Sequence, residues 1–141
     1  FNAVGGMATV AACSLTVGDT GVVMPTAVEY CPADTKTYAV CGSEYVMRVD
    51  LWSGTNYTKF NLSALVTSGC NPFHIRYRAS DSKLYIPCQG NHTVLVWNPV
   101  TDPAMGAVVQ KTGFDGPIDV VFTGTKAFAV QSGIDSLKEI I

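Results

Sequence analysis

Four side chains in this sequence could support acid–base chemistry. His74 and Asp119 are a histidine and a carboxylate, a combination in which the carboxylate orients the imidazole so that it acts as a base or a ligand. Glu29 and Arg76 form a second combination of opposite charge. The alternative is that both combinations only satisfy polar groups between neighbouring structural units, as buried charges require. We favour this alternative, and both interpretations need a fold that brings the four residues together.

Other patterns of catalytic or metal-binding residues are missing from the sequence. Its five cysteines are 10 to 29 residues apart and it has two histidines, whereas zinc sites use closely spaced ligand pairs. There is no Gly-x-Ser-x-Gly motif and no phosphate-binding loop. We therefore predict no catalytic residue, no metal and no cofactor, and the sequence favours a protein that is not an enzyme.

The elements that would position the four side chains are defined by a repeat. Pro25, Pro72 and Pro117 each open a run of alternating apolar residues, with steps of 47 and 45 residues between them. A period of this length is that of one four-stranded blade of a β-propeller.

The first two copies of the repeat align without a gap. The matched positions are Val28 with Ile75, Tyr30 with Tyr77, Asp34 with Asp81, Lys36 with Lys83, Tyr38 with Tyr85, Cys41 with Cys88 and Val49 with Val96. The third copy loses two residues in its first turn, at residues 123–126, and resumes with Phe128 in the place of Tyr85. Turns tolerate such deletions, so the third copy also fits a blade.

Period-2 alternation between turn residues predicts the strands of each copy. In copy one we expect strands at about 26–31, 36–41, 45–51 and 58–66, and in copy two the last two strands at about 93–98 and 107–111. The predicted fold is all-β, with about three four-stranded antiparallel propeller blades in a single unit over residues 1–141. Its parts are a strand at about 1–18, blades at 25–66 and 72–111, and three further strands at 117–141.

The best-matched stretch resembles the YVTN-type repeats of the surface-layer and lactonase-like propellers. Those blades have the pattern Asp-x-Lys-x-Tyr followed by Val-x-Val, and here Asp81 to Ile86 and Thr93 to Trp97 are similar to it. The sequence departs from the pattern at Pro87, in the fourth YVTN position, and at Asn98, where Asp is usual. The resemblance implies a propeller fold; a lactonase-like hydrolase that is part of a larger chain is the activity it would imply.

The repeat places the four polar side chains on equivalent strands. His74 and Asp119 share one position of the first strand of their copies, and Glu29 and Arg76 share another. This strand lines the central channel of a propeller. We therefore expect His74 to face Asp119, and Glu29 to face Arg76, between neighbouring blades.

The number of blades predicts a partner. Propellers have 4 to 8 blades, so three blades leave apolar end faces uncovered. We expect one blade to be split, with the strand at about 1–18 pairing with the strands at 117–141 of the same or another copy. Three possibilities remain open: a closed six-bladed dimer, an open fibre, and a fragment of a longer propeller.

Two features predict secretion. Three sequons for N-glycosylation occur at Asn56, Asn61 and Asn91. The cysteines predict one disulfide, for which the candidates are Cys70, Cys88 and Cys41: Cys88 could reach Cys70 within its blade, and Cys41 could reach it from the next blade. Buried free thiols are the alternative.

Composition limits the partners. Charged residues make up only 14% of the chain and the net charge is −2 without a basic cluster, so we expect no nucleic acid partner. No apolar run is long enough to predict a membrane span. Trp52 and Trp97 could stack on sugar rings, although packing between blades is the simpler role. We predict a secreted, glycosylated structural or interaction protein that assembles with other copies; the alternatives are the hydrolase fragment and a carbohydrate-binding propeller.

Overall fold

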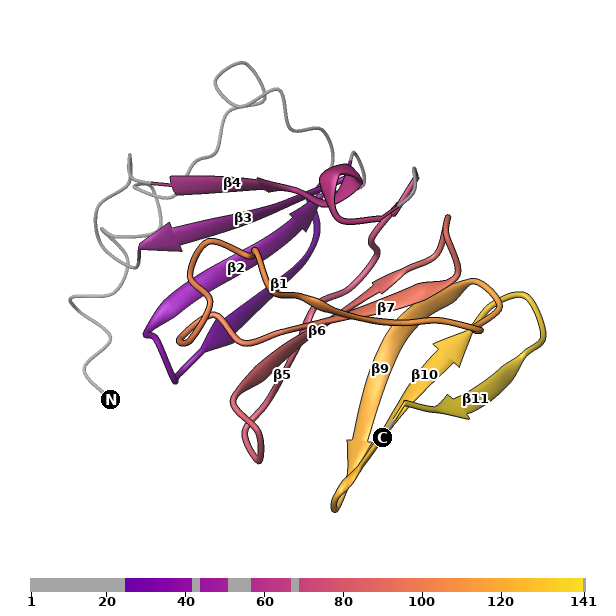
Figure 1. The fold of residues 1–141 in the computed structure, drawn as a ribbon. Helices are drawn as coiled ribbons and strands as arrows, with labels where there is room; N and C mark the ends of the chain where they lie inside the picture. Colours follow the sequence, from indigo (N-terminus) through magenta and orange to yellow (C-terminus); the bar gives the residue numbers. More distant parts are fainter. Residues whose placement is uncertain (1–24, 42–43, 51–56, 67–68, 141) are drawn as a thin grey trace, which may run out of the picture.

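The computed structural model of this chain describes residues 25–41, 44–50, 57–66 and 69–140. They form three antiparallel sheets that follow one another along the chain, from indigo to yellow in Figure 1. Blade 1 contains β1 (Pro25–Cys31), β2 (Lys36–Cys41), β3 (Tyr45–Asp50) and β4 (Tyr57–Asn61). Blade 2 contains β5 (Arg76–Arg78), β6 (Lys83–Cys88), β7 (Thr93–Trp97) and β8 (Val109–Lys111). Blade 3 contains β9 (Pro117–Thr123), β10 (Lys126–Gln131) and β11 (Ser136–Glu139).

This architecture confirms the predicted all-β class and the sheets of three to four strands. Neighbouring strands of each sheet are also neighbours in the sequence, as in a propeller blade. Blade 3 has three strands within the described part of the chain. The fourth strand, expected at about 1–18, falls outside the described residues.

The first turn of blades 1 and 2 explains their shared Asp-x-Lys-x-Tyr pattern. In blade 1 the Asp34 carboxylate accepts hydrogen bonds from the backbone N–H of Lys36, at 3.1 Å, and from the hydroxyl of Tyr38. In blade 2 the Tyr85 hydroxyl donates to Asp81 Oδ2 at 2.7 Å. One aspartate thus ties the turn to the strand that follows it.

The residue after this aspartate lies in the left-handed region of the backbone. Thr35 has a φ of 61° and Ser82 a φ of 55°. Blade 3 has Gly124 in its shorter turn, with a φ of 56°, where the missing Cβ removes the steric penalty.

Strand β3 is shifted by one residue relative to the gapless alignment. Val49 lies opposite Thr37 in blade 1, and Trp97 lies opposite Leu84 in blade 2. Because Thr37 and Leu84 are equivalent, Val49 corresponds to Trp97, and the predicted match of Val49 with Val96 is wrong. The reason is that three residues separate β2 from β3, whereas four separate β6 from β7.

The last strand of blade 1 is shorter than predicted. The expected strand at 58–66 ends at Asn61, and a 3₁₀ helix, η2 (Leu62–Ala64), follows. The Asn61 side chain caps this helix because its Oδ1 accepts the N–H of Ser63 at 2.9 Å.

Most of the hydrophobic core lies at the two joints between blades, where one blade contacts the next, and a smaller cluster of Cys41 and Met47 lies in blade 1. At the joint between blades 1 and 2, Trp97 is fully buried and meets the rings of Tyr38 and Phe60 edge-on, at centroid distances of 5.2 and 5.1 Å. At the joint between blades 2 and 3, Tyr85 meets Phe122 in the same manner at 5.2 Å. Large rings at each joint remove most apolar area from water, so these contacts hold the blades together.

Candidate functional site at the joints between blades

The strongest polar contact joins blades 2 and 3. Arg76, which begins β5, donates from Nε and Nη2 to the two carboxylate oxygens of Asp119 on β9, at 2.8 and 2.7 Å. The side chain of Arg76 is 43% exposed and that of Asp119 is 18% exposed. A bidentate ion pair with one partner largely buried fixes the relative position of β5 and β9.

The ion pair shifts the pKa values of both partners. Burial raises the pKa of the Asp119 carboxyl, but hydrogen bonds from Arg76 and the Val120 N–H, with the positive charge nearby, outweigh it and leave this pKa below its ordinary value. The hydrogen bonds to Asp119 raise the pKa of Arg76. Both groups are therefore charged at neutral pH.

Glu29 lies near Arg76 but forms no ion pair with it. Its Oε1 accepts the backbone N–H of Tyr77 at 3.2 Å, which ties β1 to β5. The charge of Glu29 adds to the raised pKa of Arg76, so the two residues are near each other, but the guanidinium turns to blade 3. The long arginine side chain reaches the carboxylate that lies beside a second hydrogen-bond donor, the Val120 N–H, at 2.8 Å from Asp119.

His74 lies beside Asp119 without being oriented by it. Its Nδ1 is 3.0 Å from the carbonyl oxygen of Ile118 and 3.9 Å from Asp119 Oδ1. A carbonyl only accepts, so Nδ1 carries the proton in this contact and Nε2 is the acceptor of the neutral ring. The histidine thus serves as a hydrogen-bond donor between blades 2 and 3.

Sequence reasoning missed a second polar network at the same joint. Arg78 is 6% exposed, and its Nη1 lies 3.3 Å from the Tyr85 hydroxyl and 3.4 Å from Asp81 Oδ2. Its Nη2 donates to the carbonyl of Thr125 in blade 3, and its guanidinium lies 5.8 Å from the ring centre of Phe122. Burial and the hydrogen bond to Asp81 raise the pKa of Tyr85 to about 12. The signal in the sequence was Arg78 at the position where blade 1 has an apolar cysteine.

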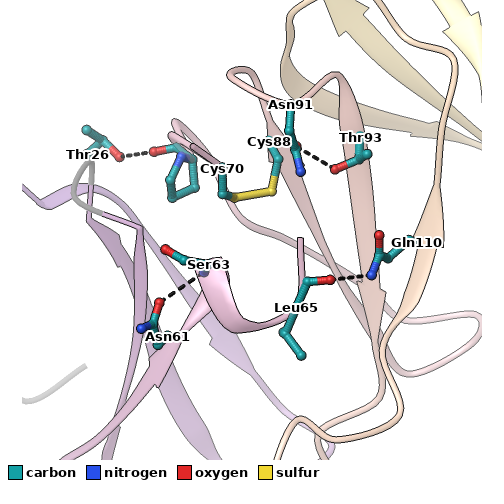
Figure 2. Close-up of a disulfide and its surroundings, with 10 residues drawn as sticks. Thr26, Asn61, Ser63, Leu65, Cys70, Cys88, Asn91, Thr93 and Gln110 are labelled. Atoms are coloured by element: carbon teal, nitrogen blue, oxygen red, sulfur yellow. Dashed lines mark hydrogen bonds between the residues drawn. A yellow bond between two sulfur atoms is a disulfide. The ribbon is translucent and has the colours of Figure 1, made fainter. Parts of the chain in front are cut away.

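The structure joins two of the three disulfide candidates. The Cys70–Cys88 bond links the segment before β5 to the end of β6, with a Cα–Cα distance of 4.5 Å (Figure 2). Cys41 is a buried free thiol whose pKa is raised by burial, and Cys31 is likewise buried and free. Cys13 lies outside the described residues.

A hydrogen bond replaces the disulfide in blade 3. Gln131 and Asp115 occupy the positions of Cys88 and Cys70, and Gln131 Oε1 accepts the backbone N–H of Asp115 at 2.8 Å. The backbone bond beside it is the same in both blades: Gly90 N–H to Cys70 O, and Gly133 N–H to Asp115 O. The same place in the repeat is therefore held by a covalent bond in blade 2 and by a hydrogen bond in blade 3.

Two of the sequons lie in the described part of the chain, and both appear in Figure 2. Asn61 is exposed at the end of β4, with its Oδ1 bonded to the Ser63 N–H. Asn91 is half-buried, and its Oδ1 accepts the hydroxyl of Thr93 at 2.7 Å. Asn56 lies outside the described residues.

Trp97 is not available for a sugar. It is fully buried, and its indole N–H donates to the carbonyl of Asp102 at 2.7 Å. Trp52 lies outside the described residues. Among the residues that the structure describes, no group of three His, Cys, Asp or Glu side chains is placed to hold a metal ion, and no helix is long and apolar enough to span a membrane.

Comparison with known proteins defines the class through the fold. The sequence matches no protein-family model and no curated protein. Solved β-propeller structures are similar to it: a chain of a nidogen/laminin complex (TM-score 0.65, 20% identity) overlaps 87% of this chain and 48% of its own length. Virginiamycin B lyase from Staphylococcus aureus (0.57, 7%) overlaps 83% of this chain and 41% of its own, and a streptogramin B lyase (0.58, 9%) overlaps 84% and 40%.

These identities establish the fold alone. The chain is a β-propeller domain that spans about half or less of the length of the structures it matches.

Proposed function

We propose that this chain is a secreted, glycosylated structural or interaction protein whose three-blade unit assembles with other copies into a larger propeller ring or fibre. The observation that carries the proposal is the exposure of Val28 on β1. Val28 is 64% exposed, whereas the equivalent Ile75 and Val120, which face the preceding blade, are 1% and 2% exposed. Val28 thus occupies a position that a blade covers wherever a blade precedes it, whereas Ala39 and Met47 in the same row of blade 1 are already buried.

The opposite end of the chain carries the same kind of face. Leu137 on β11 lies opposite Val130 and is 61% exposed. The equivalent Val46 and Val94 are fully buried and belong to the clusters at the joints with the following blade. We name these surfaces the trailing face of blade 1 (Val28 and Tyr30) and the leading face of blade 3 (Val121, Phe128 and Leu137).

Strand pairing supplies a second route to assembly. We propose that residues 1–18 complete blade 3 as a fourth strand beside β11, in the same or another copy. Within the described part of the chain, β11 pairs with β10 alone. An open strand edge favours addition of a further strand.

An extracellular location is supported by the disulfide and by the fold. Cys70–Cys88 is a bond that oxidising compartments allow to persist. The nidogen/laminin complex is an assembly of proteins with a chain similar to this one. We propose that Asn61, exposed at the rim, carries a glycan, and that Asn56 and Asn91 are further acceptors.

The test is the native mass of the 141-residue chain and of two variants, measured by light scattering or native mass spectrometry. Val28→Asp places a charge on the trailing face, whereas Val109→Asp places one on β8, where the side chain is also well exposed (51%) but off both end faces. We expect a wild-type mass of at least twice 15.0 kDa plus glycan, its loss in Val28→Asp, and its retention in Val109→Asp. A wild-type monomer over the whole concentration range would refute self-assembly.

A further inference from the structure

We infer that the assembly is a closed ring of two copies, in which Tyr30 of each copy packs on Phe128 of the other. The inference rests on the proposed self-assembly and specifies the occupant of both end faces. It follows from aromatic residues that occupy equivalent positions at both joints within the chain.

At each joint an aromatic residue on the first strand of one blade packs against the preceding blade. At the joint between blades 2 and 3, Phe122 meets Tyr85 at a centroid distance of 5.2 Å and an interplanar angle of 67°. At the joint between blades 1 and 2, Tyr77 packs against the buried cluster that contains Tyr38. Tyr77 and Phe122 are equivalent, because they lie opposite Leu84 and Ala127 at the same register of their blades.

The two end faces carry aromatic residues that are equivalent to those at the internal joints. Tyr30 is the equivalent of Tyr77 and Phe122, lies opposite Thr37, and is 45% exposed. Phe128 is the equivalent of Tyr38 and Tyr85 and is half-buried where those two are fully buried. A second copy with its blade 1 against this blade 3 would supply Tyr30 to Phe128, and Val28 would meet the same apolar face.

The leading face of blade 3 is hollowed where the second copy would sit. A shallow depression of about 400 Å³ is lined by Ile118, Val130 and Leu137 with polar residues of the turn before β11. Its apolar part continues the face that carries Phe128, since Leu137 and Val130 lie opposite each other in adjacent strands. The protruding side chains of a trailing face fit such a surface.

The joint between copies differs from the internal joints in its charge. Blade 1 uses Glu29 to bind the Tyr77 N–H, and blade 2 uses Arg76 to bind Asp119. Blade 3 has Val121, 42% exposed, at this position. The joint between copies is therefore apolar there, and salt is expected to weaken it little.

Closure at two copies follows from the arc that three blades cover. If the joint between copies has the geometry of the internal joints, six blades close into a ring, within the usual range of 4 to 8. A two-fold axis then makes both joints identical.

The test is a double-mutant cycle on the dissociation constant of the complex, with Tyr30→Ala, Phe128→Ala and the double variant. A contact of this kind changes an equilibrium by roughly 2- to 12-fold beyond its buried area. Because the ring has two such contacts, we expect a coupling of roughly 5- to 150-fold between the two substitutions. Phe73→Ala, at a 38% exposed phenylalanine before β5 in the middle blade, is the control and should leave the dissociation constant unchanged.

The outcomes separate the closed ring of two copies from self-assembly in general. A two-copy mass with this coupling, little changed by salt, supports the ring. A larger or polydisperse particle, or a dimer without coupling, overturns the ring and leaves self-assembly standing; a monomer overturns both. If Phe128→Ala does not fold, as judged by its circular dichroism and thermal unfolding, Phe128→Leu takes its place in the cycle.

Discussion

Breaking the Cys70–Cys88 bond should lower the free energy of unfolding by about 3 kcal/mol. The bond closes a loop with a sequence separation of 18. In the chain-entropy description, a loop of this size restricts the unfolded chain by about 11 cal/mol/K, which is about 3.2 kcal/mol at 25 °C. With an unfolding entropy of about 2.1 cal/mol/K per residue, the midpoint temperature should fall by about 10 °C.

The assay is urea unfolding of the wild type with and without dithiothreitol, followed by circular dichroism. The Cys70→Ala/Cys88→Ala variant should unfold as easily in both conditions, because it has no bond to reduce. Cys41→Ala is the matched control, since it removes a buried thiol from the equivalent position in blade 1 without removing a bond. It should keep the full response to the reductant.

The reasoning would be refuted if the reduced and oxidised wild-type proteins had the same urea midpoint. The backbone bond from Gly90 to the Cys70 carbonyl would then be enough to hold this part of the blade without the disulfide.

Three further predictions concern the joints and turns. Because the folded-state pKa of Asp119 lies below its ordinary value of 3.8, its contribution to stability is full above that pH and is lost as the pH falls through the folded value. In acid titrations monitored by unfolding, the stability difference between wild type and Arg76→Met should therefore be full at pH 6 and shrink below about pH 4. The pKa of Tyr85 is raised from 10.0 to about 12, so the free energy of unfolding should fall as the pH rises between these values. Tyr85→Phe should reduce the slope of the free energy of unfolding against pH by up to about 1.36 kcal/mol per pH unit. An unchanged slope would contradict the assignment. A Cβ at residue 90 would lie 1.9 Å from the carbonyl oxygen of Gly69, whereas a Cβ at residue 124 would meet nothing within 4 Å. Gly90→Ala should therefore destabilise the fold by more than the roughly 1 kcal/mol expected for Gly124→Ala. Equal falls in the thermal unfolding midpoint of the two variants would contradict this prediction.

The repeat made the blades predictable because each blade solves the same local problem. Asp34 and Asp81 fix a turn through their own side chains, so the pattern is visible without any long-range contact. The register of β3 was not predictable in the same way. Apolar residues lie on both sides of that strand, so sliding it by one residue still leaves apolar side chains on both faces of the sheet.

The triplet Asn61-Leu62-Ser63 shows how one signal has two interpretations. Its spacing is that of a sequon, and it is also that of an asparagine whose side chain bonds the N–H two residues on, which ends β4 and begins η2. The first interpretation alone predicts a strand up to residue 66, whereas the second explains why β4 ends at Asn61.

The polar contacts at the joints depended on side-chain reach, which strand positions do not define. Equivalent positions suggested Glu29 as the partner of Arg76. An arginine side chain spans several ångströms, however, and here it binds the carboxylate that accepts hydrogen bonds from both Nε and Nη2, that of Asp119. The same limit applied to the cysteines: Cys41 and Cys88 are equivalent in the repeat, and only proximity to Cys70 distinguished them.

The disulfide also determines how this chain would respond to a mechanical load. An 18-residue separation corresponds to roughly 60 Å of extended backbone, but the bond holds its ends at a Cα–Cα distance of 4.5 Å. Strands β5 and β6 lie within this loop, so a force applied through the ends of the chain would bypass them. In an oxidising environment the protein would extend through the segments outside residues 70–88, and the loop with β5 and β6 would not extend. A reducing agent would allow this loop to extend as well.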